Sequence, residues 1–410
     1  MDGLHKQRQR LILVTELFYP EEISTAHILT KIAGKLVLDY DVLVLTGPAT
    51  YEGRSYQHSS KPPVNVGNIE RLRIPALSKN NLLGRLSRFL VLSIGLGWNT
   101  LRRSRRKDIV FAVTNPAPLL VALAIIRRLR RFHLVFLVHD VFPENAVAAG
   151  IIRHDRLFYP LVKRVFNWAY GSADAVITIG RDMSEVLARK IPASAHKITL
   201  IENWADHPLV EEIPRDQSMI VSMGLSNKIV IQYAGNLGRA QGLLEFVALI
   251  SAVENDDVRY VFRGSGALSA ALSEATKGRE KFIVEGSYPR SNQDQILASC
   301  DIALVTLGPE MFGLGVPSKA YNIMAAGKPI LFIGPRNSEI YRLVKENNIG
   351  WAFDWRDEIE LISLIVSLTT KHIYLFAEMG VRARALAEKK YSEATQLDKF
   401  SSFFKTLYQS

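Results

Sequence analysis

The chain has 410 residues, of which 48% are hydrophobic, so it is too long for one ordinary core and suits two domains of about 200 residues each. Its single cysteine, Cys300, excludes an intrachain disulfide and a cysteine-rich zinc site. The net charge of +11 is uneven, because residues 1–205 carry +13 and the remainder carries −2. We therefore expect the first half to meet a polyanion, such as nucleic acid or an anionic membrane surface.

The start of the chain excludes the common targeting segments. Residues 1–10 are polar and basic, and Leu11–Val14 is too short for the apolar core of a signal peptide. No stretch of the sequence reaches the roughly 18 uncharged apolar residues of a spanning helix. Cys300 precedes an apolar run and is predicted to be a small buried residue, which fits a reducing cytosol. We expect a soluble or peripheral protein.

In the first half, short apolar runs alternate with helical patterns. Thr25–Leu38 and Leu157–Tyr170 have the periodic apolar spacing that is typical of helices. The predicted buried strands are Leu11–Val14, Val42–Leu45, Ile109–Val113, Leu134–Val138 and Ala175–Ile179.

The segment Asn81–Lys107 predicts a helix with an apolar face and a basic end. Arg85 and Arg88 are expected nearer the polar side of this helix, and Arg102–Lys107 forms the basic end. A tryptophan-bearing apolar face with a basic end is typical of a helix that lies in a membrane interface. The residues expected on the apolar face are Leu82, Leu83, Leu86, Phe89, Leu90, Ile94 and Trp98.

A second segment has a similar character, because Leu119–Ile126 is followed by the basic run Arg127–Arg131. The alternative is that both segments are ordinary covering helices with solvated basic tails. Nucleic acid is the poorer partner, because the basic residues alternate with aliphatic ones and few aromatic side chains are present to stack on bases.

The alternation of strands and helices restarts after a polar, turn-rich boundary at Asn203–Asn227. Continuous apolar strands separated by helices predict parallel sheets covered on both faces. The fold class is therefore α/β, with two Rossmann-like, doubly wound domains whose strand-end loops face each other across a cleft. The strands predicted in the second half are Ile229–Tyr233, Val258–Phe262, Phe282–Val284, Ile302–Val305 and Ile330–Ile333.

Glycine-rich loops follow the first two strands of the second half. The stretch Ala234–Gly242 separates a strand from a helix expected to begin at its end, and Arg239 adds a fixed cation. Glycines at such a turn let backbone amides approach a phosphate, although a tight structural turn is an equal alternative. Arg263–Gly266 repeats the pattern after the next strand. Because the loop is not GxGxxG, a dinucleotide is not predicted.

The most informative stretch is Gly313–Ile330, where a glycine-rich loop meets a helix start at Pro317-Ser318-Lys319. Proline suits a first helical turn, serine can cap it, and the lysine lies beside the free amides, so we expect an anion site. The alternative is a structural helix–strand unit with a stray lysine. Asp256-Asp257 resembles a metal-binding pair, but it precedes a strand, so we expect a solvated turn there.

Several motifs in the right order give the chain a resemblance to retaining glycosyltransferase family four. The resemblance covers essentially the whole chain and is narrowest to the branch that adds sugars to lipid-linked precursors of bacterial capsule, O-antigen and colanic acid. The motifs are Phe18–Glu21, Thr114–Ala117, Val138–Ala146, Gly235–Gly238, Arg263–Gly266, Val316–Lys319 and Ala325–Pro329.

The resemblance implies the GT-B arrangement. Residues 1–205 form the acceptor-side domain, residues 206–391 form the nucleotide-sugar domain, and a C-terminal helix at about residues 392–410 crosses back to the first. It implies transfer of a hexosyl group, with retention, from a nucleotide-sugar to a lipid-linked or polysaccharide acceptor. No cofactor and no obligatory metal are expected. The expected location is cytoplasmic, peripheral on the inner face of the cell membrane.

The glycine loops and the resemblance together assign roles to individual residues. The catalytic assignments are His139, Asp140, Arg239 and Lys319. The donor-binding assignments are Gly235, Asn236, Gly238, Arg239, Gln241, Gly242, Arg263, Gly264, Gly266, Tyr288, Gly313, Gly315, Val316, Pro317, Ser318, Lys319 and Asn322. The acceptor-side assignments are Tyr19, Ser24, Thr25, Asn115 and Glu144.

Three places depart from the family pattern. Leu314 and Asn322 stand where most of the family has a pair of glutamates, and Lys319 is expected to supply the cation that is missing where Gln241-Gly242 replaces a lysine. Gln241-Gly242 replaces a lysine of the first glycine loop, and Ser24-Thr25 replaces a pair of glycines. The missing glutamates leave open a catalytically inactive binding or scaffold protein of the same fold. A sugar-nucleotide epimerase is a third reading, and it needs clustered acid/base carboxylates that the sequence does not place.

Two carboxylates and a histidine are candidates on the acceptor side. His139 and Asp140 end a predicted strand, where ligands bind in such folds. His139 can contact the sugar or the acceptor, and a strand-end histidine satisfied by the backbone is the alternative. Glu144 is a candidate acceptor-side base, and an acid at a helix N-terminus is an equal alternative.

Overall fold

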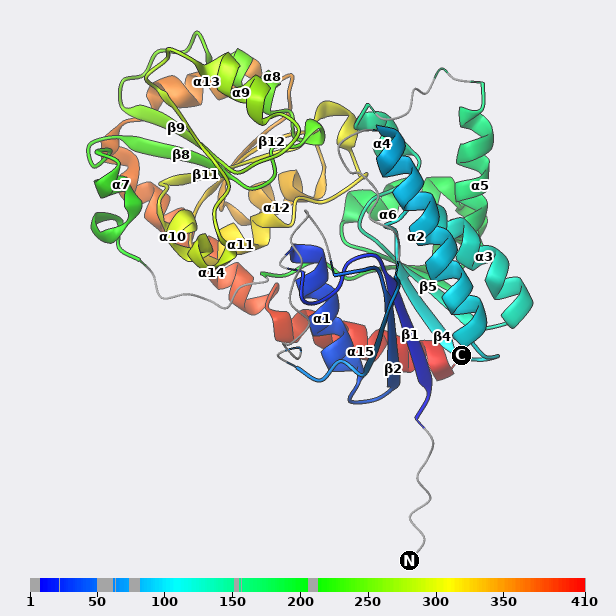
Figure 1. Cartoon of the computed structure of the whole chain (residues 1–410). Helices are drawn as coiled ribbons and strands as arrows, with labels where there is room; N and C mark the ends of the chain where they lie inside the picture. The colour runs from blue at the N-terminus through cyan, green and yellow to red at the C-terminus, as the bar shows by residue number, and fades with distance from the viewer. Residues whose placement is uncertain are drawn as a thin grey trace, which may run out of the picture. The chain divides into compact units, whose positions relative to one another are not determined.

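The structure is a computed structural model that describes residues 8–21, 23–49, 62, 64–73, 82–150, 155, 157–205 and 213–409 (Figure 1). The chain falls into two compact units. The first unit comprises Met1–Asn145, Arg153–Ile201 and Gln396–Ser410, and the second comprises Ala146–Ile152 and Glu202–Thr395. The first unit's main stretch thus ends at Ile201, shortly before the expected Ala205, and part of the expected linker, residues 206–212, lies outside the described residues.

The first unit is built on a seven-stranded parallel sheet in the order β3-β2-β1-β4-β5-β6-β7. Its central strands are the continuous apolar runs expected from the sequence, with Leu13 of β1 opposite Val44 of β2 and Phe111 of β4. The strands are β1 (Arg10–Thr15), β2 (Asp41–Thr46), β3 (Asn68–Arg71), β4 (Ile109–Val113), β5 (His133–Val138), β6 (Ala175–Thr178) and β7 (Ile198–Leu200).

Helices cover both faces of this sheet, as its buried strands require (Figure 1). The last helix belongs to this unit, because Phe404 packs edge-on against Phe111 with ring centroids 5.1 Å apart. Lys405 also pairs with Asp39 at 2.9 Å. The helices are α1 (Ser24–Leu36), α2 (Leu82–Arg103), α3 (Pro118–Arg130), α5 (Tyr159–Gly171), α6 (Arg181–Lys190) and most of α15 (Glu393–Gln409), whereas α4 (Glu144–Ala148) begins in the first unit and ends in the second.

Helix α2 has one face in the core and one exposed. Leu92 and Leu96 are fully buried, whereas Ile94 and Trp98 are 69% and 58% exposed. The prediction that Arg88 lies on the polar side is wrong, because Arg88 is buried and pairs with the buried Glu16 at 3.2 Å. The carboxylate at the end of β1 draws the guanidinium inward. The side chains of Leu82, Leu83, Arg85 and Leu86, also named in the prediction, lie outside the described residues.

The second unit is built on a six-stranded parallel sheet in the order β10-β9-β8-β11-β12-β13. Both units therefore have the strand order of a doubly wound Rossmann-like domain, which confirms the predicted fold class. The strands are β8 (Ile229–Ala234), β9 (Val258–Arg263), β10 (Phe282–Glu285), β11 (Ile302–Thr306), β12 (Ile330–Ile333) and β13 (Gly350–Phe353).

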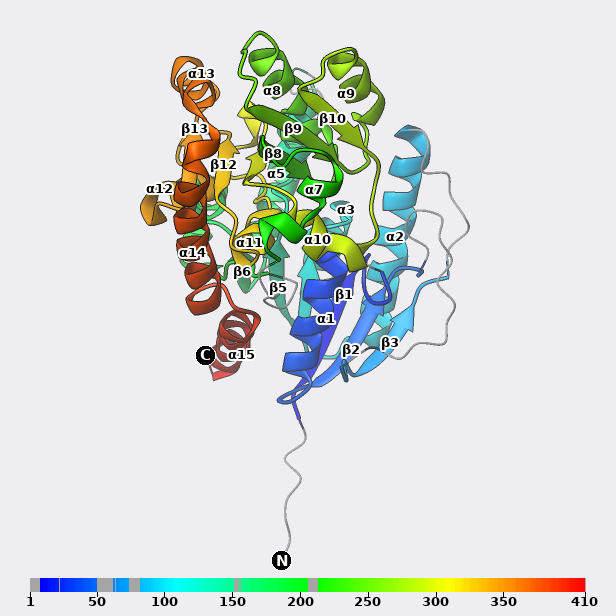
Figure 2. The ribbon, with the colours of Figure 1, turned by 90° about the vertical axis from the view of Figure 1, so that its left-hand side faces the viewer.

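The core of the second unit lies between the sheet and helices α8, α9 and α13, which contribute Phe246, Leu272 and Leu361 to one buried cluster. On the other face, α14 passes α11 so closely that a side chain on Gly380 would lie 2.0 Å from the carbonyl oxygen of Gly327 (Figure 2). The helices are α7 (Met219–Ser222), α8 (Leu243–Ile250), α9 (Ser269–Thr276), α10 (Gln293–Ala298), α11 (Lys319–Ala325), α12 (Glu339–Asn347), α13 (Glu358–Ser367) and α14 (Ile373–Lys389).

Three strands were not expected from the sequence: β3, β7 and β13. Each lies at the edge of its sheet and has only one neighbouring strand. An edge strand need not be buried on both sides, so β3 has the polar sequence Asn-Ile-Glu-Arg and β13 begins with a glycine. Cys300 is free and buried, as predicted, and burial raises the pKa of its thiol to about 12.

Among the described residues, no single helix is long and apolar enough to cross a membrane, although Glu358–Ser367 and Thr370–Leu407, bent by 93°, pass that test as a pair.

Candidate functional site

The glycine loops after β8 and β9 form one continuous backbone surface at the carboxyl end of the second sheet. Gly235 and Gly264 have φ angles of 135° and 144°, which favour glycine. A side chain on Gly264 would lie 1.8 Å from the carbonyl oxygen of Gly235, so neither loop has room for one. The amide of Leu237 donates to the carbonyl of Ser265 at 3.0 Å. The loops therefore expose backbone where a ligand can approach.

Lys319 extends from the start of α11 to this surface. Its Nζ lies 3.4 Å from the centroid of the Tyr233 ring, and a side chain on Gly235 would lie 3.1 Å from the same nitrogen. The nitrogen is buried and has no hydrogen-bond partner among the described residues. Burial lowers the pKa of Lys319 from 10.5 to about 7. A buried amine without a counter-charge beside a glycine loop is a site prepared for an anion.

Tyr233 was expected only as a strand residue, and the structure adds it to the site. Its hydroxyl donates to the carbonyl of Asn236 at 2.7 Å, and its ring is fully buried. Burial raises the pKa of Tyr233, so the phenol remains a neutral donor. The signal in the sequence was an aromatic residue next to the last position of a strand that leads into a glycine loop, which is a weak signal without the position of Lys319.

Arg239 lies in a single 3₁₀ turn, Arg239–Gln241, rather than at the start of the following helix. Its side chain is exposed and makes no ion pair or hydrogen bond with another described residue. Gly308 fixes this turn, because its amide donates to the carbonyl of Ala240 at 2.8 Å. Arg239 is therefore a free cation on a loop that is attached to the carboxyl end of β11.

The helix expected at Gln241 or Gly242 begins at Leu243. Gly242 has a φ of 68°, and a side chain there would lie 2.5 Å from the ring of Trp355. Trp355 in turn donates from Nε1 to the carbonyl of Leu307 at 2.8 Å. This environment favours a packing role for Gly242 over its predicted contact with a phosphate.

Arg263 was assigned to donor binding, but its side chain is 1% exposed and turned into the interior. It pairs with Glu285 at 2.7 Å and donates to the hydroxyl of Ser299 at 2.7 Å. The assignment is corrected for the side chain, because an arginine that is buried and neutralised has no free charge for a ligand. The backbone that follows it, at Ser265 and Gly266, is exposed and still forms the loop surface.

The loop before α11 is buried at Gly313 and Gly315 and leads through Val316 and Pro317 to the helix. The prediction that Ser318 caps the helix is wrong, because its side chain accepts no capping hydrogen bond. Helix α11 has only seven residues, so the Lys319 side chain, rather than the helix dipole, is the main positive group of this loop. Asn322 is buried on the same helix.

Tyr288 follows β10 and is partly buried. Burial raises its pKa, and it lies close enough to Tyr233 to affect the pKa of that phenol. Tyr288 therefore lies in the neighbourhood of Tyr233, and its assignment to the donor site stays a prediction.

In the first unit, His139 and Asp140 stand at the carboxyl end of β5. Both backbone amides donate to the hydroxyl of Thr114 at 3.2 Å. His139 Nε2 is buried with no hydrogen-bond partner among the described residues, and burial lowers the pKa of the ring to about 4. Burial raises the pKa of Asp140 to about 6, although Asn145 donates to its Oδ1 at 2.9 Å. At neutral pH the pair is therefore a neutral imidazole beside an ionised carboxylate.

Glu144 lies at the first position of α4 and is held by Lys190, whose Nζ is 2.6 Å from both carboxylate oxygens. A carboxylate bound in this way is a poor base, so the structural alternative is favoured. The remaining acceptor-side candidates gather at strand ends. Tyr19 and Asn115 each precede a cis proline after β1 and β4, and Ser24 and Thr25 open α1.

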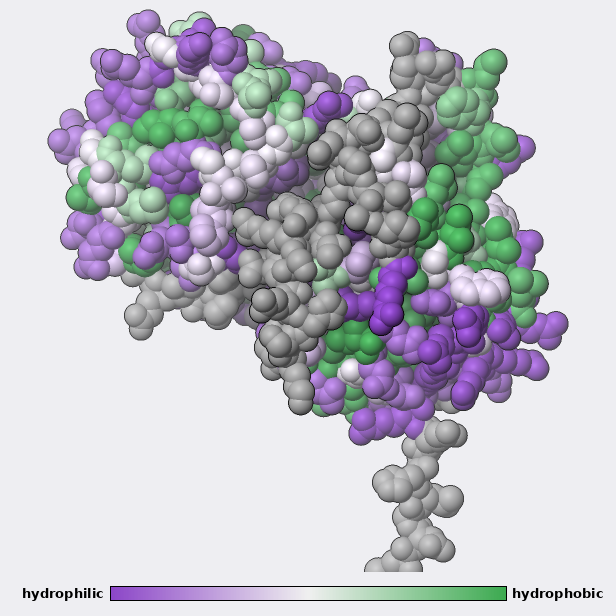
Figure 3. Space-filling model, in the orientation of Figure 1, coloured by the Kyte–Doolittle hydropathy of each residue, from purple (hydrophilic) through white to green (hydrophobic). Residues whose placement is uncertain are grey.

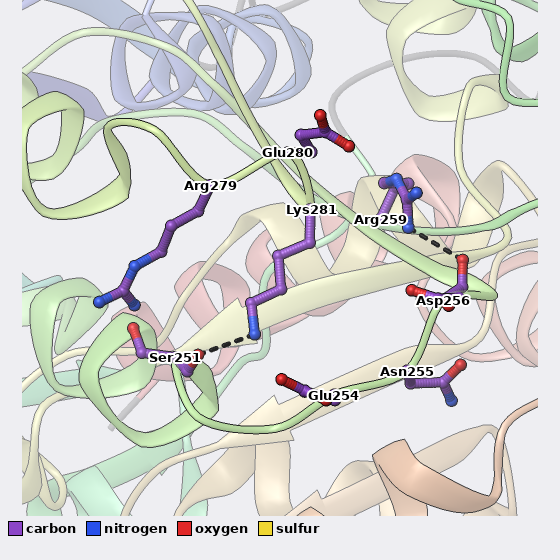
Figure 4. A pocket seen from close by; sticks show the side chains of 8 residues that line it. All are labelled: Ser251, Glu254, Asn255, Asp256, Arg259, Arg279, Glu280 and Lys281. Atoms are coloured by element: carbon purple, nitrogen blue, oxygen red, sulfur yellow. Dashed lines mark hydrogen bonds between the residues drawn. The ribbon is translucent and has the colours of Figure 1, made fainter.

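A cavity of about 660 Å³ lies at the opposite, amino end of the second sheet (Figure 4). Its three acidic and three basic side chains balance in charge, and Lys281 donates to the carbonyls of Ile250, Ser251 and Val253. Lys281 thus closes the end of α8. The turn at Asp256 receives hydrogen bonds from Lys228 and Arg259, as expected of a structural turn. No group of three metal-binding side chains occurs among residues that the structure describes.

Comparison with known proteins identifies relatives along most of the chain. Residues 37–208 match the model described as Glycosyltransferase Family 4, and residues 228–371 match Glycosyl transferases group 1. The chain is 34% identical, over 405 residues, to a protein of Pseudomonas aeruginosa called "Probable glycosyltransferase WbjE". That match covers 97% of this chain and 98% of the relative.

Two solved structures show the same fold. Anabaena Alr3699/HepE in complex with UDP-glucose matches with a TM-score of 0.66 and 17% identity, over 97% of this chain and 99% of that one. WaaG, a glycosyltransferase involved in lipopolysaccharide biosynthesis, matches with a TM-score of 0.67 and 14% identity, over 96% and 99%. These likenesses confirm the predicted two-domain GT-B fold.

Proposed function

The chain belongs to glycosyltransferase family 4, and from that premise we propose that it moves a hexosyl group, with retention, from a nucleotide-sugar to a lipid-linked or polysaccharide acceptor. The observation that carries the proposal is the Lys319 amine, which is buried against the Gly235 loop and has no hydrogen-bond or ion-pair partner among the described residues. Departure of a nucleoside diphosphate concentrates negative charge on its phosphates. A preformed cation at that place stabilises the charge as it develops.

The donor is proposed to bind in the second unit. Lys319 at the start of α11 and the exposed Arg239 lie at the same end of the sheet, and the backbone at Gly235, Ser265 and Gly266 provides surface at the ends of β8 and β9. Anabaena Alr3699/HepE, of the same fold, was solved with UDP-glucose, which supports a nucleotide-sugar as the ligand. Arg239 and the protonated Lys319 can also do the electrostatic work of a metal ion, so we propose transfer without one.

On the acceptor side, His139 and Asp140 are proposed to contact the sugar or the acceptor hydroxyl. The neutral His139 ring can accept or donate one hydrogen bond through Nε2, which is otherwise unused. Asp140 supplies a negative charge that favours an oxocarbenium-like sugar. The bound state of Glu144 gives it no part in this proposal.

Attachment to the inner face of the cell membrane is proposed through three neighbouring helices of the first unit. α2 packs beside α3, and α3 beside α5. Figure 3 shows apolar residues gathered over these helices, above a hydrophilic region. The exposed apolar side chains, here called the apolar face, are Leu90, Val91, Ile94, Trp98, Ile125, Leu129, Phe158 and Leu161. An apolar face next to a basic segment is suited to an anionic membrane interface.

Not every arginine near the apolar face is free for lipid. Arg103 pairs with Glu70 at 2.9 Å, and Arg127 donates from Nε to Asp174 at 2.8 Å. Arg128 lies 5.1 Å from the centroid of the Trp168 ring. Arg102, Arg105 and Arg106, here called the basic tail, are exposed and are the residues proposed to meet lipid phosphates.

The purified full chain tests the function directly. We expect slow hydrolysis of a UDP- or GDP-sugar in the absence of acceptor, and faster turnover when membranes with lipid-linked sugar are added. Lys319→Ala should remove both activities. Tight binding without any turnover would favour the inactive scaffold, and release of an epimerised nucleotide-sugar would favour an epimerase.

A further inference from the structure

We propose that Tyr233 is a positioning residue that holds Lys319 against the Gly235 loop without a counter-charge, so that the donor diphosphate itself becomes the missing counter-ion. The inference rests on the proposed function, because it concerns the same donor site. It adds Tyr233 to the site and gives separate roles to its ring and its hydroxyl. It also predicts that a proton is taken up when the donor binds.

The ring of Tyr233 fixes the position of the amine. Tyr233 comes from β8 and Lys319 from α11, so the 3.4 Å contact between Nζ and the ring centroid joins two separate elements. The ring is 0% exposed and belongs to the core under α8, so it cannot move aside without disturbing that core. An ammonium over an aromatic face is attracted by the ring quadrupole but keeps its charge available to an anion.

The hydroxyl of Tyr233 fixes the loop. It donates to the carbonyl of Asn236 at 2.7 Å, on the residue that follows Gly235. One side chain therefore sets both the cation and the backbone that face the same ligand. Two substitutions of Tyr233 separate the contact of the ring from that of the hydroxyl. Phenylalanine removes only the hydroxyl, whereas leucine removes the aromatic ring as well.

The charge around Lys319 is unbalanced in the free protein. The titratable or charged side chains of the elements at this end of the sheet are Tyr233 on β8, Arg239 in the 3₁₀ turn, Glu245 on α8, Arg263 on β9, Glu285 on β10, Tyr288 after β10 and Glu310 in the 3₁₀ turn before α11. Of the three carboxylates among them, Glu285 is paired with Arg263, and Glu245 and Glu310 are exposed to solvent. Burial, rather than a neighbouring charge, lowers the pKa of Lys319 to about 7.

A bound diphosphate reverses this imbalance, because its negative charge favours the protonated amine. The complex then holds a proton that the free protein has partly lost at pH 7 and above. Affinity should therefore fall as pH rises, by about tenfold between pH 6 and pH 8 when the free amine titrates near 7. UDP-glucose is the suitable probe, because its diphosphate diester does not change charge in that range.

The experiment is isothermal titration of the full chain with UDP-glucose, and in parallel GDP-mannose, at pH 6, 7 and 8 in buffers of different ionisation enthalpy. We expect wild type to take up protons on binding and to show the tenfold pH dependence. Tyr233→Phe should keep the pH dependence and bind a few-fold more weakly. Tyr233→Leu should bind at least tenfold more weakly, and Lys319→Met should lose the pH dependence.

Tyr260→Leu is the matched control, because Tyr260 is an equally buried tyrosine on the adjacent strand β9 that packs on Phe246 and Phe282. It should bind as wild type does despite a similar loss of core. Wild-type affinity and pH dependence in a folded Tyr233→Leu overturn this inference alone. If Tyr233→Leu does not fold, loss of the pH dependence in Tyr233→Phe overturns it. Failure of wild type to bind either nucleotide-sugar overturns the proposed function together with the inference.

Discussion

Replacing Lys319 with methionine should make the free protein more stable while removing the donor contact. Methionine keeps the unbranched shape of lysine without its charge. Burial lowers the pKa of Lys319 from 10.5 to about 7, so between these values the unfolded chain binds more protons at this site than the folded chain. Wild-type stability therefore rises with pH through this window, and the cost of burying the charge is fully present below pH 7.

The size of the effect follows from one proton. Where the unfolded chain binds one proton more than the folded chain, the free energy of unfolding changes by about 1.4 kcal/mol per pH unit. The stability advantage of Lys319→Met over wild type should be greatest below pH 7, and should narrow by about 2.3 kcal/mol between pH 7, where the folded amine is half-titrated, and pH 9. A substitution that stabilises the protein and abolishes donor binding would identify Lys319 as a charge kept for its ligand.

Urea unfolding followed by tryptophan fluorescence measures this difference, because Trp351 and Trp355 both lie in the second unit. Lys277→Met is the matched control, since Lys277 is an exposed lysine after α9. Its difference from wild type should be small and the same at each pH. An advantage of Lys319→Met that does not change from pH 7 to pH 9, or a wild type that is the more stable protein at pH 7, would refute the reasoning.

Other parts of the site and surface give further expectations. Arg239→Ala should weaken UDP-glucose binding about tenfold by removing one charge-assisted contact, and unchanged calorimetric affinity would argue against that contact. Transfer should continue in EDTA, whereas activity lost in EDTA and restored by Mg²⁺ or Mn²⁺ would contradict metal-free chemistry. The fraction of protein that sediments with vesicles should depend on anionic lipid and fall as the salt concentration rises. It should also fall when the three arginines of the basic tail are changed to glutamine, and a variant that sediments like wild type would disprove the role of the tail. Arg88→Met should destabilise the first unit by about 3–5 kcal/mol, because it removes the arginine that pairs with the buried Glu16. A decrease in the free energy of unfolding of less than about 1 kcal/mol, measured by equilibrium unfolding, would show that the pair is dispensable.

The sequence by itself determined the central architecture. Parallel strands buried on both faces are mostly apolar, so β4 and β12, among others, could be recognised as continuous runs. The glycine loops were also predictable, because their φ angles and close backbone contacts exclude side chains, as at Gly264. The uneven charge and the basic end of α2 followed from composition alone.

The direction and partner of each polar side chain were decided only by the tertiary structure. Arg88 and Arg263 read as exposed or ligand-binding cations in the sequence, yet each turns inward because a carboxylate from a distant segment lies within reach. The contact between Lys319 and Tyr233 depends on β8 lying beside β11 in the sheet, since that order brings the start of α11 over the end of β8. Local sequence patterns predict where a helix or strand lies. Contacts such as these depend on the order of the strands in the sheet, because that order places residues side by side that are far apart in the chain.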